Sequence, residues 1–337
     1  MKAMILAAGY GTRLRPITYT LPKPMVPLCN RPLIGWAVES FLAAGVRDLI
    51  VNLHHLPGVL EQYLHERYSR HATLHFSFEH EILGTGGGIR RVRPLLENDE
   101  DFFLVNGDTV QFPRYDELRD ARRAVDALAA LTLRHPPEND RFTAVWNDHG
   151  RVTGFGQGTG EALMFSGSHC ISARIFRYLP DKDFSGIVDE VYQPQLANET
   201  MAAVVNDGLW FDIGTPQRYL TASHALLAAI VAGDVTPPQG SLVRDDSLVD
   251  ATAAMPGSRT RSVIGARSNV RGELVDSIVW DDCAIGGSVR LERCIVAHGV
   301  NVAGPVELSD VMICREDAAI PHDAGYERRD GLVIVPI

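Results

Sequence analysis

The sequence predicts an α/β protein in two parts: a mixed, mostly parallel sheet with helices on both faces, followed by a short parallel β-helix. Two observations support this prediction. In the first two-thirds of the 337 residues, apolar strand patterns alternate with helical patterns, which is typical of parallel sheets covered by helices. After residue 241 the helical period disappears, and short apolar triplets recur between glycines at a fixed spacing.

The first part alternates regularly between the two kinds of element. Lys2–Ala7 is a short continuous apolar run, as expected of a strand buried on both faces. Pro32–Ala44 has a helical period, with proline at its start and Gly45 just past its end, as is common at helix termini. Similar patterns predict strands at Asp48–Leu53, Thr73–Phe78 and Phe102–Val105, and helices at Pro57–Ser69, Gly88–Leu96 and Pro216–Ala232.

The domain boundary is predicted from a change in composition. Between Ala127 and Phe211 the pattern becomes β-rich, with one or two helices. The segment Gly233–Ser241 has the proline and glycine content of a linker. We therefore expect a first domain over residues 1–232, a linker over 233–241 and a second domain over 242–337.

The second domain is predicted from a repeat. The triplets Ser277–Val279, Cys294–Val296 and Val311–Ile313 are centred 17 residues apart, and single apolar positions keep the same spacing. Such a repeat is typical of a β-helix coil with three short faces, and the segment has room for three to four coils. His298 lies within it, but so short an array favours a scaffold, regulatory or assembly role, such as a homo-oligomer, over acyl transfer.

Composition excludes several classes of protein. A net charge of −10 without a basic tail or stripe argues against nucleic-acid binding. No apolar run is long enough to span a membrane, and the apolar run Ala3–Ala8 is too short for a signal peptide. The five cysteines form no CxxC pair, which predicts buried free thiols in a reducing compartment. We expect a cytoplasmic protein.

The segment "LAAGYGTRLRP" (Leu6–Pro16) follows the first predicted strand directly. A glycine-rich turn at the carboxyl end of a buried parallel strand lets backbone N–H groups approach a phosphate. Arg13 lies immediately behind the glycines, and Lys23 follows between two prolines. The chain has 29 arginines and only three lysines, so a lysine at this position is unusual. We expect both cations near one anion-binding turn.

Two further predicted strand ends carry an aspartate. Asp108 follows the apolar run of "LVNGDT", and Asp212 follows that of "LWFDIGT". Ligands of open α/β sheets bind at such carboxyl ends. Two aspartates beside a phosphate-binding turn are suited to Mg²⁺, which uses few protein oxygens and leaves positions for phosphates and water. The alternative for each residue alone is a turn or a helix cap.

The motifs together resemble one family. In order they are LAAGxGTR at 6–13, PKPMVP at 22–27, LGTGGG at 83–88, VNGD at 105–108, FSG at 165–167 and WFDIGT at 210–215. This set closely resembles the sugar-1-phosphate nucleotidylyltransferases, also called NDP-sugar pyrophosphorylases, over about residues 1–230. The resemblance implies a Rossmann-like sheet. The repeat resembles the C-terminal left-handed β-helix of bacterial mannose-1-phosphate guanylyltransferase-like proteins.

The resemblance implies that a sugar-1-phosphate oxygen attacks the α-phosphorus of a nucleoside triphosphate and that pyrophosphate leaves. Such a reaction depends on positioning and charge neutralisation. By the family pattern Asp108 and Asp212 hold Mg²⁺ between the phosphates. Arg13 binds the departing β- and γ-phosphates with its planar fork. Lys23 reaches the α-phosphate as a compact charge.

The resemblance also implies two binding regions. The nucleotide region includes the glycines of the 84–88 run, on which a base would lie, and Gly87 and Gly88 would open the following helix. Either Glu79 or Glu81 would accept a hydrogen bond from uracil or guanine. Trp210 is a candidate wall for the sugar. The predicted nucleotide-binding residues are Leu6, Ala7, Ala8, Gly9, Gly11, Thr12, Arg13, Lys23, Glu79, Gly84, Thr85 and Asp108, and the predicted sugar-phosphate-binding residues are Asn106, Ser166, Gly167, Asp189, Glu190 and Asp212.

One departure from the family pattern concerns the sugar phosphate. Many members carry a Glu-Lys-Pro motif before Phe-Ser-Gly, whose lysine contacts that phosphate, but residues 151–167 contain no lysine. Arg134, His135 or the metal ion must replace it. The same absence looks most like the N-acetylmuramate-1-phosphate uridylyltransferases, so UTP with an amino-sugar or hexose 1-phosphate is the leading prediction. GTP with mannose or heptose 1-phosphate is the alternative.

A rival of another class is a non-catalytic regulatory relative that keeps the fold and binds nucleotide sugars or partner enzymes. Such a protein is expected to lose one of the four residues on which the chemistry depends. The chain keeps Arg13, Lys23, Asp108 and Asp212, which favours an enzyme.

Overall fold

The computed structural model describes residues 1–137, 142–322 and 324–337. It divides into two compact units: unit 1 comprises Met1–Gly9 and Ile34–Phe211, and unit 2 comprises Tyr10–Leu33 and Asp212–Ile337. Each unit is described by itself below. The division differs from the boundary expected at the linker, because the segment with Arg13 and Lys23 groups with the C-terminal part.

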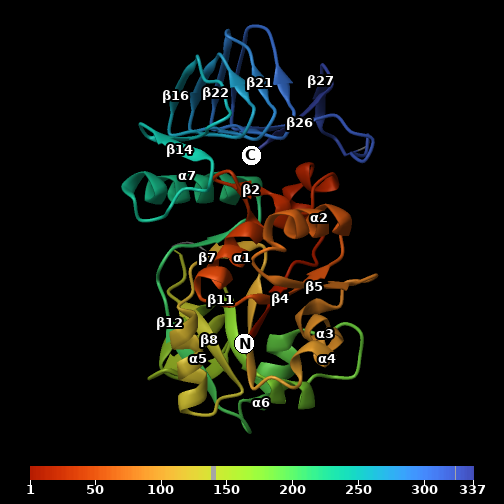
Figure 1. The fold of residues 1–337 in the computed structure, drawn as a ribbon, viewed down its shortest axis with the longest axis vertical. Helices are drawn as coiled ribbons and strands as arrows, with labels where there is room; N and C mark the ends of the chain where they lie inside the picture. Colours follow the sequence, from red (N-terminus) through yellow and green to blue (C-terminus); the bar gives the residue numbers. More distant parts are fainter. Residues whose placement is uncertain (138–141, 323) are drawn as a thin grey trace. The chain divides into compact units, whose positions relative to one another are not determined.

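Unit 1 is built on a nine-stranded sheet in the order β5-β4-β1-β6-β11-β8-β12-β10-β9 (Figure 1). Strands β5, β4, β1 and β6 are parallel, whereas β11 is antiparallel to both of its neighbours, so the sheet is mixed. Strands β7 and β13 form a separate pair. The bounds are β1 Lys2–Leu6, β4 Asp48–Leu53, β5 Thr73–Phe78, β6 Asp101–Asn106, β7 Thr109–Gln111, β8 Ala129–Arg134, β9 Ala144–Asp148, β10 Arg151–Phe155, β11 Glu161–Ser172, β12 Met201–Val205 and β13 Trp210–Asp212.

The parallel strands form the centre of the core, as their apolar sequences predict. Met4, Ile50 and Leu104, from β1, β4 and β6, are fully buried in one hydrophobic cluster. One helix prediction was wrong at its start: the helix expected from Gly88 begins at Gly84 and is divided at Val92. The α-helices are α1 Leu33–Ala43, α2 Pro57–Tyr68, α3 Gly84–Arg91, α4 Arg93–Leu96, α5 Tyr115–Ala124, α6 Gln193–Gln195 and, in unit 2, α7 Pro216–Ala232.

Unit 2 contains the parallel β-helix that the repeat predicts (Figure 1). Its coils stack into three parallel ladders, and the antiparallel strands β14, β27 and β28 extend the first ladder at its two edges. The ladders contain β15 Ser247–Asp250, β17 Val263–Ile264, β20 Ile278–Val279, β23 Ile295–Val296 and β26 Val311–Arg315; β16 Ser258–Thr260, β19 Glu273–Val275, β22 Val289–Glu292 and β25 Val306–Ser309; β18 Asn269–Val270, β21 Ala284–Ile285 and β24 Asn301–Val302; the edge strands are β14 Ser241–Arg244, β27 Glu327–Arg329 and β28 Leu332–Pro336.

The β-helix begins earlier than the 17-residue repeat indicates. In the first ladder Leu248 pairs with Val263, Val263 with Ile278, Ile278 with Ile295, and Ile295 with Met312. The steps are therefore 15, 15, 17 and 17 residues, from the differences between these numbers. A search at a fixed spacing of 17 residues misses the two 15-residue coils, although they stack in the same ladder.

A ladder of small polar side chains runs through the buried interior of the coils. The Ser247 hydroxyl accepts a hydrogen bond from the Ser262 N–H at 3.1 Å, and Ser262 accepts one in turn from the Ser277 N–H at 3.1 Å. Ser277 accepts one from the Cys294 N–H, also at 3.1 Å. Each hydroxyl thereby satisfies a buried backbone donor in the next coil, so this column fixes the stacking of the coils.

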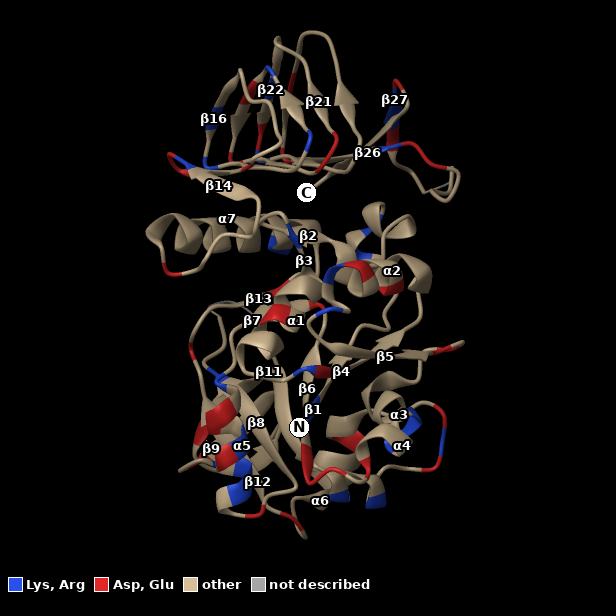
Figure 2. Cartoon of the chain, viewed as in Figure 1, with Lys and Arg blue, Asp and Glu red and all other residues tan. Residues whose placement is uncertain are grey.

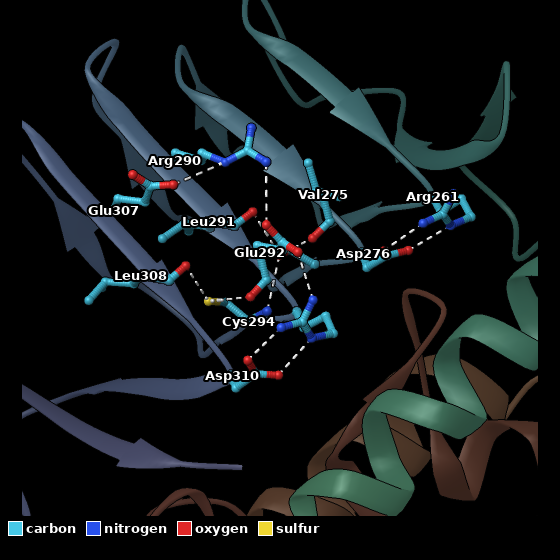
Figure 3. A network of polar contacts seen from close by, with 12 residues as sticks. Arg261, Val275, Asp276, Arg290, Leu291, Glu292, Cys294, Glu307, Leu308 and Asp310 are labelled. Carbon is cyan, nitrogen blue, oxygen red and sulfur yellow. Dashed lines mark hydrogen bonds and ion pairs between the residues drawn. The ribbon is translucent and has the colours of Figure 1, made fainter.

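Arginine and aspartate alternate along one corner of the coils (Figure 3). Arg261 contacts Asp276 through two hydrogen bonds of 2.7 and 2.6 Å, and Arg293 contacts Asp310 at the same two distances. All four residues have positive φ, between 43° and 55°, so this column turns the chain in the left-handed region. Paired charges there favour one alignment of neighbouring coils, because a shifted coil would place like charges together.

Within unit 2, hydrogen bonds join the β-helix to α7 and to the segment after Lys23. The Trp280 indole N–H donates to the Tyr219 hydroxyl at 2.8 Å, and that hydroxyl donates to the Pro27 carbonyl at 2.6 Å. Asn30, in the turn between β2 (Pro27–Leu28) and β3 (Arg31–Pro32), donates to the Ile264 carbonyl at 3.0 Å. These contacts explain why Tyr10–Leu33 groups with the C-terminal part.

Several predictions from composition can be compared with the structure. The five cysteines are buried free thiols, as predicted, and burial raises the pKa of Cys283 and Cys294 to about 11. Figure 2 shows acidic and basic residues interspersed within each unit. Among the described residues, no helix is long and apolar enough to cross a membrane.

Candidate functional site

The predicted site residues fall into one group in unit 1 and two groups in unit 2. In unit 1, the carboxyl ends of β1 and β6 lie side by side, with Leu6 paired to Asn106. The Gly107 N–H donates to the Leu6 carbonyl at 2.8 Å. A Cβ atom on residue 107 would lie only 2.9 Å from that carbonyl oxygen, so the close approach requires glycine. The Asn106–Asp108 turn is thus held against the start of the glycine-rich turn, as the strand-end argument predicts.

Glu79 supports the glycine-rich turn through hydrogen bonds that pass by way of Asn52. The Ala7 N–H donates to Asn52 Oδ1 at 2.7 Å, and Asn52 Nδ2 donates to Glu79 Oε1 at 2.7 Å. The other carboxylate oxygen of Glu79 accepts the Leu83 N–H at 3.0 Å, and the residue is only 4% exposed. Glu79 therefore supports the turn through Asn52, which the motifs did not reveal. A direct contact between Glu79 and a base stays a prediction.

The glycine run of α3 is explained by packing against a distant segment. A Cβ atom on Gly84 would lie 2.5 Å from the Ser185 carbonyl oxygen, and one on Gly87 would lie 2.2 Å from the Asp183 carbonyl oxygen. The Gly86 N–H donates to the same Ser185 oxygen at 2.8 Å. The glycines therefore let protein backbone approach the helix, and the expectation that a base lies on them stays a prediction.

Thr85 also contacts that distant segment. Its hydroxyl accepts the Ile187 N–H at 2.8 Å. Ile187 leads into the π-helical turn Val188–Tyr192, which carries the predicted sugar ligands Asp189 and Glu190. Asp189 is exposed. Glu190 forms an ion pair with Lys182 and accepts the Gly186 N–H at 3.0 Å; the hydrogen bond from Lys182 lowers the pKa of its carboxyl.

The predicted sugar region brings together Asn106, Ser166 and Gly167. The Ser166 hydroxyl donates to the Thr132 carbonyl at 3.1 Å, and the residue is buried. Ser166 would therefore contact a sugar through its backbone rather than through its side chain. A Cβ atom on Gly167 would lie 2.5 Å from Asn106 Nδ2, and Gly167 has a φ of +92°. Glycine at this position therefore lets the Asn106 side chain lie against β11.

In unit 2, Lys23 packs against the second half of the glycine-rich turn. Gly11 has a φ of +61°, and a Cβ atom there would lie 2.9 Å from the Cβ of Lys23. Lys23 opens a 3₁₀ turn, Lys23–Met25, with Pro22 before it in extended conformation and Pro24 within it. The side chain is only 7% exposed. The flanking prolines thus restrict the backbone of a buried lysine beside the turn, and its contact with a phosphate stays a prediction.

The second group in unit 2 consists of Arg13, Asp212 and Arg218. Around Gly214, a Cβ atom would lie 3.1 Å from Arg13 Nη1 and 3.1 Å from Asp212 Oδ2. The Arg218 Nη1 donates to the same Asp212 oxygen at 2.5 Å. Arg218 was missed in the motif analysis, although its position in the first turn of α7, just after Asp212-Ile-Gly-Thr, was a usable signal.

The donor set is compatible with a divalent metal ion. No cluster of three or more His, Cys, Asp or Glu side chains suited to a metal ion occurs in residues 1–137, 142–322 and 324–337. A magnesium ion held by one or two carboxylates, water and substrate phosphates needs no such cluster. Asp212 contacts Arg218 through Oδ2, and its Oδ1 accepts no hydrogen bond from the described part of the chain. That oxygen suits a metal ligand.

Comparisons with known proteins agree on one family. The family model described as "Nucleotidyl transferase" matches residues 2–229. The mannose-1-phosphate guanylyltransferase catalytic subunit beta of Danio rerio is 30% identical, over 95% of this chain and 92% of that protein. The mannose-1-phosphate guanyltransferase of Hypocrea jecorina is 26% identical, over 90% and 83% respectively.

A solved structure has a similar fold. HddC from Yersinia pseudotuberculosis, in complex with GMP-PN, gives a TM-score of 0.57 at 24% identity. The match covers 67% of this chain and 99% of that one. At this identity the likeness shows the fold alone.

Proposed function

The chain belongs to the nucleotidyl transferase family and is a sugar-1-phosphate nucleotidyltransferase, and we propose that it transfers the guanylyl group of GTP to mannose 1-phosphate. The products are GDP-mannose and pyrophosphate. The family match spans the strands and motifs of the first 229 residues, and the Danio rerio relative aligns over 95% of the chain, including the β-helix.

This proposal changes the order of the two substrate predictions. The leading prediction, UTP with an amino-sugar or hexose 1-phosphate, depended on a missing lysine and on motifs that several subfamilies share. The relatives, which are mannose-1-phosphate guanylyltransferases, instead support the guanylyl alternative. A carboxylate acceptor suits either base, so the motifs alone do not discriminate between uracil and guanine.

The observation that supports the chemistry most directly is the strand-end arrangement in unit 1. The Gly107 N–H to Leu6 carbonyl bond of 2.8 Å keeps the Asp108 turn beside the glycine-rich turn. A carboxylate next to backbone N–H groups that face a phosphate is what metal-assisted phosphoryl chemistry needs.

The reaction is an in-line displacement at the α-phosphorus. A phosphate oxygen of the sugar 1-phosphate forms the new P–O bond, and the bond to the β-phosphate oxygen breaks, releasing pyrophosphate. We assign Arg13 to the departing β- and γ-phosphates, because a planar fork contacts two oxygens at once. Lys23 neutralises charge that grows at the α-phosphate. Arg218 orients Asp212 through their ion pair.

Nucleotidyl transferases of this family generally use a divalent metal ion, and we propose Mg²⁺. Asp108 and Asp212 would hold it, as the family pattern implies. A bound Mg²⁺ would neutralise the phosphate oxygens and lower the barrier to attack.

A pyrophosphate-release screen tests the proposed function. The full-length chain is incubated with Mg²⁺, each of the four common NTPs and a panel of sugar 1-phosphates that includes mannose, heptose, glucose and N-acetylated amino sugars. GTP with mannose 1-phosphate should give the highest kcat/KM. Preferential use of UTP, or of another sugar, would refute the substrate assignment while leaving the family intact.

Substitution of the aspartates tests their assignment. Asp108→Asn and Asp212→Asn should each reduce pyrophosphate release by about 10²–10³-fold, the scale of a lost electrostatic contact in a transition state. Asp116→Asn, on the exposed face of α5, serves as control. Unfolding midpoints near that of the wild type would show intact folding. Near-normal turnover in either variant would remove that residue from the metal site.

A further inference from the structure

Arg134, the last residue of β8, carries a cation whose immediate contacts are neutral backbone groups. Its Nη1 donates to the Gly208 carbonyl at 2.9 Å and its Nε to the His135 carbonyl at 3.3 Å. Within residues 1–137, 142–322 and 324–337, no carboxylate forms an ion pair with it. Partial burial lowers the pKa of Arg134 and the charge of the nearby Asp207 carboxylate opposes this, and an arginine remains protonated at neutral pH.

A continuous series of contacts within unit 1 links Arg134 to the predicted sugar region. Its guanidinium carbon lies over the Trp210 ring, 5.5 Å from the ring centroid. The Trp210 indole N–H donates to the Ser166 carbonyl at 3.0 Å. Gly167, the next residue, packs directly against Asn106, two residues before Asp108. The indole therefore fixes the plane of the guanidinium next to the Phe-Ser-Gly segment.

His135, the other candidate cation, is already neutralised by two acids. Its Nδ1 lies 2.9 Å from Asp207 Oδ2, and its Nε2 lies 2.9 Å from Glu161 Oε1. Hydrogen bonds to Asp207 and Glu161 raise the pKa of His135, but even its protonated form is outnumbered by two carboxylates. Such a group repels a phosphate dianion rather than attracting it.

We infer that Arg134 binds the phosphate of the sugar 1-phosphate and so replaces the lysine that is missing from residues 151–167. Two backbone carbonyls and the indole face hold the guanidinium in place, and its Nη2 edge can donate two hydrogen bonds to phosphate oxygens. This inference rests on the proposed function, because it assigns a contact to the acceptor substrate of that reaction.

Two substitutions in the full-length chain distinguish this role from a structural one. Arg134→Gln keeps an N–H donor for the Gly208 carbonyl but removes the charge, whereas Arg134→Lys keeps the charge but removes the fork. For Arg134→Gln we expect the KM for mannose 1-phosphate to rise about 10–100-fold, the scale of a charge-assisted hydrogen bond, with the KM for GTP nearly unchanged. Arg134→Lys should recover part of the loss.

The control is Arg119→Gln, because Arg119 lies on α5 and forms ion pairs with Asp116 and Asp120 in the same unit. Both KM values should stay at their wild-type levels there. A wild-type KM for mannose 1-phosphate in Arg134→Gln would overturn the inference, as would equal losses for the Gln and Lys variants. If the wild-type enzyme uses a different sugar 1-phosphate, the KM values of the variants are compared with that sugar instead. No turnover of any NTP and sugar pair would overturn the proposed function itself, and the inference with it.

Discussion

The position of Lys23 explains why a chain with 29 arginines uses lysine there. The side chain is 7% exposed, and its Cβ packs against Gly11, which has no Cβ to obstruct it. Pro22 and Pro24 restrict the backbone on either side. A compact ammonium suits this confined position, whereas a planar guanidinium needs space for a fork.

Lys23→Arg should therefore lose most activity although it keeps the charge. We expect kcat/KM for pyrophosphate release to fall about 10²–10³-fold, because a planar fork needs more room in this buried position than a compact ammonium does. Lys2→Arg is the matched control, since Lys2 is partly exposed and pairs with Asp99 at 2.9 Å. Equal rates for wild type and Lys23→Arg would show that charge alone matters at this position.

Glu79→Gln tests whether the buried glutamate supports the glycine-rich turn. Both of its carboxylate oxygens accept hydrogen bonds, from Asn52 and from the Leu83 N–H, and glutamine would direct an NH₂ group at one of these donors. We expect a loss of about 1–3 kcal/mol in the free energy of unfolding, measured by urea denaturation. Glu81→Gln, at an exposed position, should have no effect on stability.

A Glu79 that only contacts a nucleobase would behave differently. In that case Glu79→Gln would leave the unfolding free energy unchanged and alter only the KM for the nucleotide. Denaturation without nucleotide and kinetics with nucleotide therefore separate the two roles.

At the scale of elements, the serine ladder predicts which changes the β-helix tolerates. Ser277→Ala removes the acceptor for the Cys294 N–H, a buried donor that has no access to water. We expect a loss of about 1–3 kcal/mol in unfolding free energy. Ser277→Cys should cost less, because Cys294 occupies the next position of the same column. If both variants were as stable as the wild type, the column would not contribute to stacking.

The regular elements were predictable because local patterns determine them. The strands Asp48–Leu53 and Thr73–Phe78 and the helix Pro216–Ala232 have the bounds that the sequence predicts, since their apolar runs end at proline, glycine or charge. The start of α3 was missed because Gly84–Gly88 has poor helix propensity. Contacts with Asp183–Ser185, about 100 residues away in sequence, stabilise the Gly84–Gly88 segment as a helix.

The site was predictable where residues are adjacent in a motif and not where distant residues meet. Asp108 and Lys23 lie in recognisable segments next to glycine or proline. Asn52 does not: it lies within a buried strand, and only the structure brings its amide between Ala7 and Glu79. Arg218 was missed because its contact with Asp212 is seen only in the structure, although its place just after the Asp212-Ile-Gly-Thr segment was a usable signal.

At the scale of the whole molecule, Trp280→Phe tests the connection within unit 2. The substitution removes the indole N–H that donates to Tyr219, whose hydroxyl donates to Pro27, four residues after Lys23. Burial raises the pKa of Tyr219, so that hydroxyl stays protonated. We expect about 1–3 kcal/mol less unfolding free energy and a several-fold lower kcat.

Trp146→Phe provides the comparison, because the Trp146 indole donates to the Gly156 carbonyl within unit 1 and the residue is only partly buried. It should change neither stability nor kcat appreciably. A Trp280→Phe enzyme with the kcat of the wild type would show that the β-helix is not needed to position the segment after Lys23.

The composition of unit 2 from Tyr10–Leu33 and Asp212–Ile337 has a consequence for synthesis. Arg13 and Lys23 are synthesised well before the coil residues Ile264 and Trp280, which hydrogen-bond to Asn30 and, through Tyr219, to Pro27. At about 5–20 residues per second, the roughly 240–260 residues between Lys23 and these coil residues take about 12–50 s to make. The segment that carries the two proposed phosphate-binding cations therefore reaches its final packing only after these coils are made.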